Sequence, residues 1–249
     1  MPGGRQHATI GVAPAAPIVG RLVRAGAAVA TAAGACLLLW VGLVWLWQDP
    51  FTALYTDFQQ HRLEVQYRER RAGYHAFEPS VGGSAVIGAE ARRYRVSSRR
   101  GEAMGVIRIP RLGLDAVVVE GTDHRSLMGG PGFYAGDSLP GEGQLVYIAG
   151  HRTTYSAPFS HIERLRRGDR VTIEMPYGSF VYVITGHRIV PASDLAVLRT
   201  HGHEQLILQA CHPRFSASHR YLAYARLRSV RTNGRTLSAA ERAPEAGPT

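Results

Sequence analysis

The residues best suited to chemistry in this chain are one cysteine, one histidine and one arginine, each next to an apolar run. Cys211 follows the run Leu206–Ala210, and Arg220 comes nine residues later at the start of another run. Upstream, His151 lies just beyond the run Leu145–Ala149. A thiol, an imidazole and a guanidinium together supply a nucleophile, a proton carrier and a stabiliser for a developing oxyanion. The grouping is typical of an enzyme that attacks a peptide carbonyl through sulfur.

Cys211 has no cysteine with which it could form a disulfide. The other cysteine, Cys36, lies inside an apolar segment, so the sequence predicts no disulfide framework. A free thiol titrates near ~8.5, and a neighbouring cation favours the reactive thiolate. A buried, inert cysteine is the alternative interpretation.

Several histidines outside the first 75 residues could serve as the cation. They are His151, His161, His187, His201, His203, His212 and His219. If the strand continues through Cys211, His212 points to the opposite face, and it is then a polar residue before a turn. The same objection separates His219 from Arg220, and His187 is typical of a solvated strand end. His151 would lie at the rim of the sheet, where a structural hydrogen bond explains it as simply as catalysis does.

Arg220 opens a strand that could pair with the Cys211 strand across the turn Pro213–His219. Such a hairpin would place the guanidinium near the thiol. A guanidinium is a planar, multi-donor group that suits an oxyanion. For an arginine considered alone, a surface ion pair is the alternative.

These groups must be positioned by a β-rich domain, which we place at residues 105–231. Its predicted strands are Val106–Ile109, Ala116–Glu120, Leu145–Ala149, Arg170–Glu174, Phe180–Thr185, Leu206–Ala210 and Tyr221–Leu227. Short helices are predicted at Asp123–Met128 and Phe159–Arg167, the latter closed by Gly168. Seven or eight short strands with few helices favour an all-β closed barrel or a sandwich, because closure removes exposed edges.

An apolar segment without charges precedes this domain at residues 25–48. It is long enough to span a hydrocarbon core of about 30 Å. Arg21 and Arg24 flank its start, whereas the nearest basic residue beyond it is Arg62. The positive-inside rule therefore predicts a single-pass anchor with residues 1–24 in the cytoplasm and the β-rich domain outside. A cleaved signal peptide is the alternative, but no A-x-A site follows the most apolar stretch.

Residues 49–104 join the anchor to the β-rich domain. Phe51, Leu54, Tyr55 and Phe58 follow helical spacing, so we predict a juxtamembrane helix at 49–71 whose second, charged half is solvated. Residues 73–102 show no clear periodicity and are interpreted as a linker. The tail at 232–249 is polar and is predicted to be disordered.

The formal net charge is +10, and all 29 basic residues are arginine. Because these arginines are spread along the chain, they indicate a GC-rich genome and argue against a nucleic-acid partner. A basic surface also suits work near anionic lipid or wall polymer.

The chain resembles the sortases, which are membrane-anchored cysteine transpeptidases of Gram-positive bacteria. The resemblance covers residues 105–227 and rests on motifs that stand in the family's order: Gly105-Val106-Ile107-Arg108-Ile109-Pro110, Ala149-Gly150-His151-Arg152-Thr153-Thr154-Tyr155, Phe159-Ser160-His161-Ile162-Glu163-Arg164-Leu165-Arg166-Arg167-Gly168-Asp169, and Cys211-His212-Pro213-Arg214-Phe215-Ser216-Ala217-Ser218-His219-Arg220. The stretches around His151 and Cys211 look most like class E sortases of actinobacteria, with class D as the neighbour.

This resemblance implies a closed eight-stranded β-barrel with His151, Cys211 and Arg220 around one groove. It further implies cleavage of an LPxTG-like sorting signal between Thr and Gly, with LAxTG preferred in class E. Cys211 would form a thioacyl enzyme, His151, as an imidazolium, would protonate the leaving amine, and Arg220 would bind the oxyanion. The expected partners are surface proteins with LAxTG or LPxTG signals and an amine from a peptidoglycan precursor or a pilin. No metal or other cofactor is expected.

One motif departs from the family pattern. Sortases carry Thr-Leu-x-Thr before the cysteine, where this chain has Ile207-Leu208-Gln209-Ala210, so no hydroxyl is available at Ala210. We expect the connection 190–198 to form one wall of the groove. The predicted substrate contacts are Ala210, Leu195, Val197 and Tyr155.

Three other functions fit parts of the pattern. A secreted cysteine hydrolase could use the same thiol and imidazole, but the papain-like order places Cys before His. An L,D-transpeptidase would carry a His-Gly motif before the cysteine, where this chain has Gln209-Ala210. A non-catalytic, membrane-tethered barrel could bind wall peptide, and an unreactive Cys211 would favour it.

Overall fold

The structure, a computed structural model, describes residues 16–47, 50–75, 83–200, 202–232 and 235–238. It divides into two compact units, Met1–Trp47 and Gln48–Thr249.

The first unit contains one long helix, α1 (Ala16–Trp47). Within α1, Gly20–Leu43 is a stretch of 24 residues with a mean hydropathy of 1.9, long and apolar enough to cross a membrane. Leu37, Leu38 and Leu39 are 63–74% exposed, so no other part of this unit that the structure describes buries their apolar side chains. The helix extends into the predicted cytoplasmic tail, and residues 1–15 of that tail lie outside the described part of the chain.

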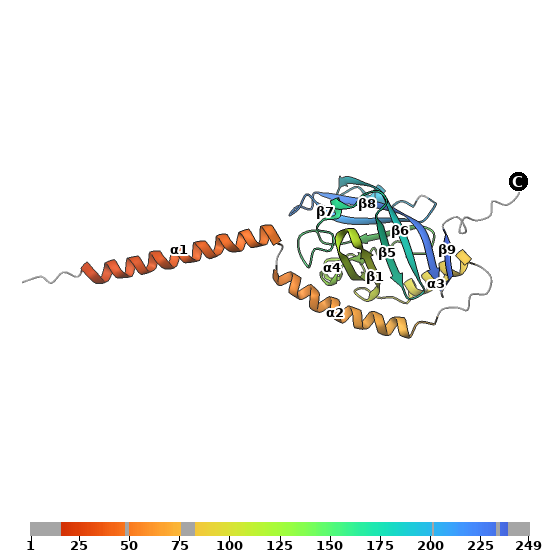
Figure 1. Cartoon of the computed structure of the whole chain (residues 1–249), viewed down its shortest axis with the longest axis horizontal. Helices are drawn as coiled ribbons and strands as arrows, with labels where there is room; N and C mark the ends of the chain where they lie inside the picture. Colours follow the sequence, from red (N-terminus) through yellow and green to blue (C-terminus); the bar gives the residue numbers. More distant parts are fainter. Residues whose placement is uncertain (1–15, 48–49, 76–82, 201, 233–234, 239–249) are drawn as a thin grey trace, which may run out of the picture. The chain divides into compact units, whose positions relative to one another are not determined.

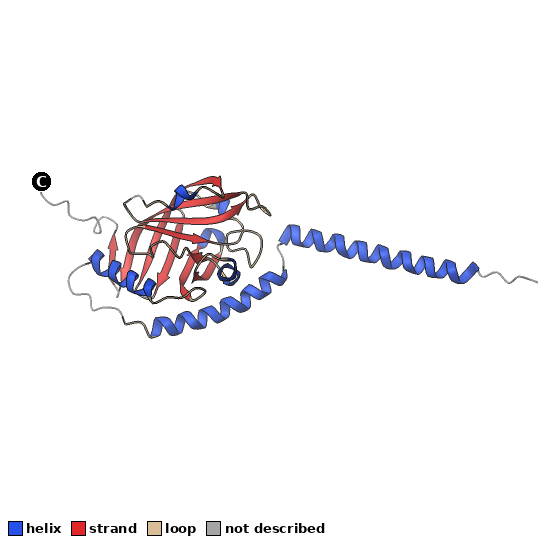
Figure 2. Cartoon of the chain, turned by 180° about the vertical axis from the view of Figure 1, so that it is seen from behind, coloured by secondary structure: helices blue, strands red, loops and turns tan. Residues whose placement is uncertain are grey.

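The second unit is built on a β-barrel (Figures 1 and 2). Its strands are β1 (Ala103–Ile109), β2 (Leu114–Glu120), β3 (Gly132–Phe133), β4 (Leu145–Ala149), β5 (Arg170–Met175), β6 (Gly178–Pro191), β7 (Gln205–His212), β8 (His219–Thr232) and β9 (Arg235–Ser238). The order β6-β5-β1-β2-β3-β4-β7-β8 is closed by pairing of β6 with β8, and β9 pairs with the last residues of β8. The predicted closed eight-stranded barrel is confirmed.

The short helices of this unit are α4 (His124–Gly129) and the 3₁₀ turns η1 (Pro110–Leu112), η2 (Ile162–Arg164) and η3 (Leu195–Leu198). The helix predicted at Phe159–Arg167 is shortened to η2. Phe159, Ile162 and Leu165 are all buried, and Leu165 already has extended backbone angles. The turn ends at Leu165, whose extended backbone stops the helix, and these three apolar side chains still enter the core.

Helix α2 (Pro50–Ala72) lies along the outside of the barrel beside β1 and β2 (Figure 1). Gln60 clamps the edge of β2, because its amide nitrogen donates to the carbonyl of Val117 and its amide oxygen accepts from the N–H of the same residue, at 3.1 and 2.7 Å. Tyr67 is buried and donates to the carbonyl of Glu174. The second half of α2 is therefore docked through Gln60 and Tyr67, which corrects the prediction that this half is solvated, although charged residues such as Arg62 and Arg68 are exposed.

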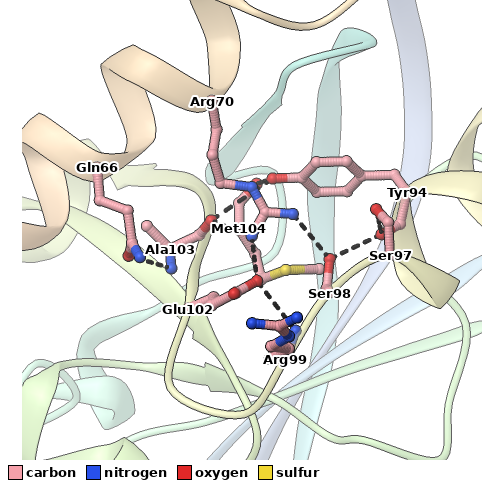
Figure 3. A network of polar contacts seen from close by, with 9 residues as sticks. All are labelled: Gln66, Arg70, Tyr94, Ser97, Ser98, Arg99, Glu102, Ala103 and Met104. Atoms are coloured by element: carbon pink, nitrogen blue, oxygen red, sulfur yellow. Dashed lines mark hydrogen bonds and ion pairs between the residues drawn. The ribbon is translucent and has the colours of Figure 1, made fainter.

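Polar contacts extend this docking at the C-terminal half of α2 (Figure 3). Arg70 donates to Glu102 at 2.7 Å and to Ser98 at 3.1 Å. Gln66 accepts from the N–H of Ala103 at the start of β1. Helix and barrel thus share a hydrogen-bonded seam.

A helix, α3 (Gly83–Val96), occupies half of the segment predicted to be a linker. Ile87, Ala91 and Tyr94 are buried, and Tyr94 donates to the carbonyl of Met104 at 3.0 Å. These residues follow helical spacing, but arginines on the other faces of the helix hide the pattern. The segment is therefore part of the barrel's core, and residues 76–82 lie outside the described part.

Part of the tail that was predicted to be disordered is instead a strand, because Arg235–Ser238 pair with β8 as β9. Residues 239–249 lie outside the described part of the chain.

Two buried clusters lie on opposite sides of β7. Leu206, Leu208 and Ala210 belong to the main core of the barrel. The intervening Ile207 belongs to a second cluster, completed by Leu145, Tyr147, Ala149, Val190 and Leu222. The alternation of side chains therefore assigns the residues of β4, β7 and the first part of β8, up to Leu227, to one of two faces.

Candidate active site

Cys211 and Arg220 are direct cross-strand partners in the antiparallel pair of β7 and β8. Side chains opposite each other in such a pair share a face and lie close together. The hairpin predicted from the sequence is therefore present. It is the reason that a thiol and a guanidinium separated by nine residues come together.

His151 reaches the same region from β4. This strand runs parallel to β7 with Ala149 opposite Gln209, and the N–H of Gly150 donates to the carbonyl of Gln209 at 3.0 Å. The chain therefore still follows β7 when it reaches His151.

The alternation of side chains assigns the three candidate residues to one face. Cys211 lies four positions beyond Ile207 on β7, and Arg220 lies two before Leu222 on β8; both reference residues belong to the second cluster. His151 lies two positions beyond Ala149 of the same cluster, past the end of β4, and we infer the same face for it from the Gly150–Gln209 bond that continues the pairing with β7. The thiol, the imidazole and the guanidinium thus lie on the face of the sheet that carries the second cluster.

The His151 ring is half-buried, and its surroundings disfavour the charged form. Burial lowers its pKa below the ordinary value of 6.5, and the positive charge of His124 lowers it further. The rings of Tyr155 and His124 lie 5.0 and 6.3 Å from it between centroids. These surroundings therefore favour the neutral imidazole, whereas the sequence analysis expected an imidazolium.

The Nε2 atom of His151 is buried and has no hydrogen-bond partner among the described residues. Buried polar atoms are normally paired. An unpaired imidazole nitrogen on the face that carries Cys211 is available to exchange a proton with a bound reactant.

The side chain of Arg220, a residue of β8, is bound to the end of the turn that joins β7 to β8. Its Nη1 donates to the carbonyls of Ala217 and His219 at 2.7 and 3.1 Å. Its charge also reaches Tyr147 of the second cluster, where it opposes the rise in the pKa of the phenol that burial causes. A guanidinium has five N–H donors, so these two contacts orient Arg220 and leave capacity for an anionic oxygen.

Arg152, which the sequence analysis did not single out, lies on the other side of the sheet from the thiol. It is 6% exposed and forms an ion pair with Glu163 at 2.9 Å. It also donates to the carbonyl of Cys211 and to Nδ1 of His212, at 3.2 and 2.7 Å. Burial and the adjacent arginine charge lower the pKa of His212, which agrees with a neutral imidazole whose Nδ1 accepts a hydrogen bond from Arg152.

The prediction that His212 faces away from Cys211 is therefore confirmed. The alternation of side chains along a strand predicted this orientation of His212. Applied to Arg152, it would have placed the arginine on the face opposite to His151. The sequence did not indicate that Arg152 and His212 contact each other on that face.

His124 was also missed. It begins α4, whose N-terminus is capped by Asp123 accepting from the N–H of Ser126 at 3.2 Å. The cap predicts the helix, but no sequence pattern connects His124 with His151.

The predicted substrate contacts fall into three groups. Ala210 is fully buried in the main core, which argues against a substrate contact through its side chain, and its substrate-binding role stays a prediction. Tyr155 packs on His151. Leu195 is 71% exposed on η3, and Val197 of the same turn packs against the second cluster.

The described residues contain no group of three or more His, Cys, Asp and Glu side chains arranged to hold a metal ion.

Residues 107–228 match the family model described as the Sortase domain. The chain belongs to the sortase family. Its fold agrees with that of a Clostridium perfringens Sortase D5 transpeptidase, with a TM-score of 0.56 at 23% identity over 68% of this chain and 98% of that one. The family resemblance inferred from the motifs is confirmed.

Two curated relatives are similar in sequence. Sortase D of Bacillus subtilis is 34% identical over 131 residues, which are 51% of this chain and 64% of that protein. Sortase SrtE1 of Streptomyces coelicolor is 26% identical over 157 residues, which are 56% of this chain and 44% of that protein. The chain thus spans about half to two thirds of these relatives, and both class D and class E are represented among them.

Proposed function

We propose that this sortase is a membrane-anchored cysteine transpeptidase of class E. It cleaves an LAxTG or LPxTG sorting signal between Thr and Gly and transfers the acyl group to an amine of a peptidoglycan precursor or a pilin. The observation that carries the proposal is the shared face of Cys211, Arg220 and His151 beside the second cluster.

The chemistry follows from the order of the three groups. The neutral imidazole of His151 takes the thiol proton as the Cys211 sulfur forms a bond with the threonine carbonyl carbon. The carbonyl oxygen becomes an oxyanion, which the Arg220 guanidinium binds. Cleavage of the C–N bond then releases the glycine amine, which receives the proton from His151.

The second half of the reaction reverses these steps with a different amine. That amine attacks the thioester and gives up a proton through His151. The C–S bond breaks, and the Cys211 thiol is restored. Because the acyl group is held as a thioester between the two halves, transfer needs no other source of energy.

α1 is proposed to be the membrane anchor, with the N-terminus in the cytoplasm and the barrel outside. The apolar stretch Gly20–Leu43 supports the anchor. Arg21 and Arg24 near its start, against the absence of basic residues between Arg24 and Arg62, support the orientation.

The test uses the full chain in detergent with an LAxTG peptide, an LPxTG peptide and an amine acceptor, followed by mass spectrometry. We expect cleavage between Thr and Gly, ligation to the amine, and a covalent acyl adduct on Cys211. Cys211→Ala is expected to abolish all three. Hydrolysis without ligation would indicate a cysteine hydrolase, and binding without cleavage or adduct would indicate a non-catalytic barrel.

A further inference from the structure

We propose that the first turn of α2 is a positioning part of the active site: Thr52 and Ala53 hold the loop Tyr155–Ala157 so that the Tyr155 ring packs on His151. This inference rests on the proposed role of His151. The loop follows His151 by four residues, and α2 approaches it from about one hundred residues earlier in the chain.

The loop has an unusual backbone. Tyr155, Ser156 and Ala157 all have positive φ angles, of 53°, 55° and 36°. Residues with a Cβ atom rarely adopt the left-handed region, and three in succession are disfavoured. Such a conformation persists only where the surrounding structure fixes it, and it occurs mainly at functional sites.

The contacts that fix it come from α2. The N–H of Tyr155 donates to Oγ1 of Thr52 at 3.0 Å, and Oγ of Ser156 donates to the carbonyl of Ala53 at 3.3 Å. The rings of Tyr55 and Tyr155 meet edge to face with centroids 6.4 Å apart. All of these partners belong to the first two turns of α2.

Besides these contacts, the side of the loop that faces α2 borders an open space. Tyr155 and Ser156 line a cavity of about 390 Å³, which is also lined by Gln60 and His61 of α2 and by Asp115 of β2. The first turn of α2 therefore bridges to the loop across one end of a cavity. Removing the Thr52 acceptor would leave the loop free to move toward this space.

Rigid docking makes α2 a suitable support. Gln60 is clamped on β2, and Gln66 and Arg70 bind the start of β1 and the segment that precedes it (Figure 3). These contacts fix the second half of the helix whose first turn holds the loop.

The loop in turn controls the surroundings of His151. Tyr155 lies 5.0 Å from the His151 ring and 5.9 Å from the His124 ring. These are the titratable groups that face His151 from the loop and from α4, and Asp57 of α2 approaches Ser156 at 3.5 Å. A displaced Tyr155 would uncover His151 and change where the imidazole lies relative to Cys211.

The test compares Thr52→Val, which removes the acceptor at similar volume, with Thr52→Ser, which keeps it. Leu54→Ala, at a position 71% exposed on the same turn, is the matched control. The full chain in detergent is titrated by NMR of its histidine side chains without substrate, and peptide transfer is measured from pH 5 to 8.

We expect Thr52→Val to raise the midpoint of the His151 titration toward the ordinary value near ~6.5. We expect it to lower kcat by about tenfold, because small misplacement of a reacting group is costly. Thr52→Ser and Leu54→Ala should resemble the wild type. If Thr52→Val does not fold, Ser156→Ala, which removes the contacts of the serine hydroxyl with Ala53 and Asp57 and keeps the Thr52 bond, should move the titration in the same direction by less.

An unchanged His151 titration and a kcat within twofold of the wild type in Thr52→Val, or in Ser156→Ala if the first does not fold, would overturn the inference. Failure of the proposed function is distinguishable from this outcome. It would appear as an inactive wild type, whereas the titration of His151 needs no substrate and still reports on the loop.

Discussion

The guanidinium of Arg152 donates a hydrogen bond at 3.2 Å to the carbonyl of Cys211, from the face of the sheet opposite to the thiol. The same group is tied to Glu163 and His212. The backbone of the proposed nucleophile is therefore fixed by a buried cation, which is in turn held by a carboxylate. In the proposed mechanism, Arg152 is a positioning residue and does not itself contact the reacting atoms.

Replacing Arg152 with Met should destabilise the barrel. The change leaves the Cys211 carbonyl and Nδ1 of His212 without their donor, for which we expect a loss of about 1–3 kcal/mol of unfolding free energy. The loss is smaller than for a fully buried ion pair because Glu163 is 41% exposed and can be solvated. Urea unfolding measures it.

The matched control is Arg68→Met, which removes an ion pair whose side chains are 70% and 50% exposed. Its cost should stay below about 1 kcal/mol. Equal losses in the two variants would show that the contacts of Arg152 beneath Cys211 contribute nothing special.

Stability should fall in mildly acidic solution because of His151. Its pKa is lowered in the folded state, whereas an unfolded histidine titrates near ~6.5. Below that pH the unfolded chain binds more protons, so unfolding becomes easier as the pH falls from about 6.5 through the folded-state pKa. In the variant His151→Gln, this contribution to the pH dependence of the unfolding free energy is absent.

The measurement is the urea midpoint of both proteins between pH 5 and 8. The wild type should lose stability relative to His151→Gln as the pH is lowered. His212, whose pKa is also lowered, remains in both proteins and cancels in the comparison. Parallel pH dependences would contradict a depressed His151 pKa.

The sequence predicted the barrel and the Cys211–Arg220 hairpin because both follow from local patterns. Apolar runs separated by turns define strands, and the short turn between β7 and β8 leaves almost no choice of pairing. The same strands, with side chains alternating between faces, correctly placed His212 away from Cys211.

The remaining parts depend on contacts between distant segments. α3 was missed because its buried side, including Ile87 and Tyr94, is short and lies among arginines. Arg152 and His124 were missed because each acquires its role from a partner on another element. Ala210 was assigned to the substrate from its place in a motif, whereas alternation from Leu208 already places it in the main core.

The exposed turn η3 should form one wall of the substrate groove. Leu195 is 71% exposed there, while Val197 anchors the turn on the second cluster. Leu195→Ser should therefore raise KM for the sorting peptide with kcat little changed, because an apolar contact made equally in the bound and transition states is lost. An unchanged KM would remove η3 from the groove.

Tyr182→Phe should weaken the barrel without altering the active site. The Tyr182 hydroxyl donates at 2.6 Å to the buried carboxylate of Glu204, which also accepts from the N–H groups of Gly141 and Gly143. Loss of a hydrogen bond to a charged group costs about 1.5–3 kcal/mol. Thermal unfolding should show this loss, while the His151 titration stays in place; a shift of that titration would contradict the assignment.

Gly150→Ala should damage both stability and peptide transfer, because Gly150 joins β4 to His151 where no side chain fits. A Cβ atom there would lie 2.7 Å from the ring of Phe159, which is fully buried. Overpacking of this kind costs about 1–3 kcal/mol, and the strain falls on the residue before His151.

Gly186→Ala is the matched control, since its Cβ would meet only a side-chain nitrogen of Arg167 at 3.7 Å. Urea unfolding and transfer rates should separate the two variants, and equal behaviour would show that His151 does not depend on close packing at Gly150.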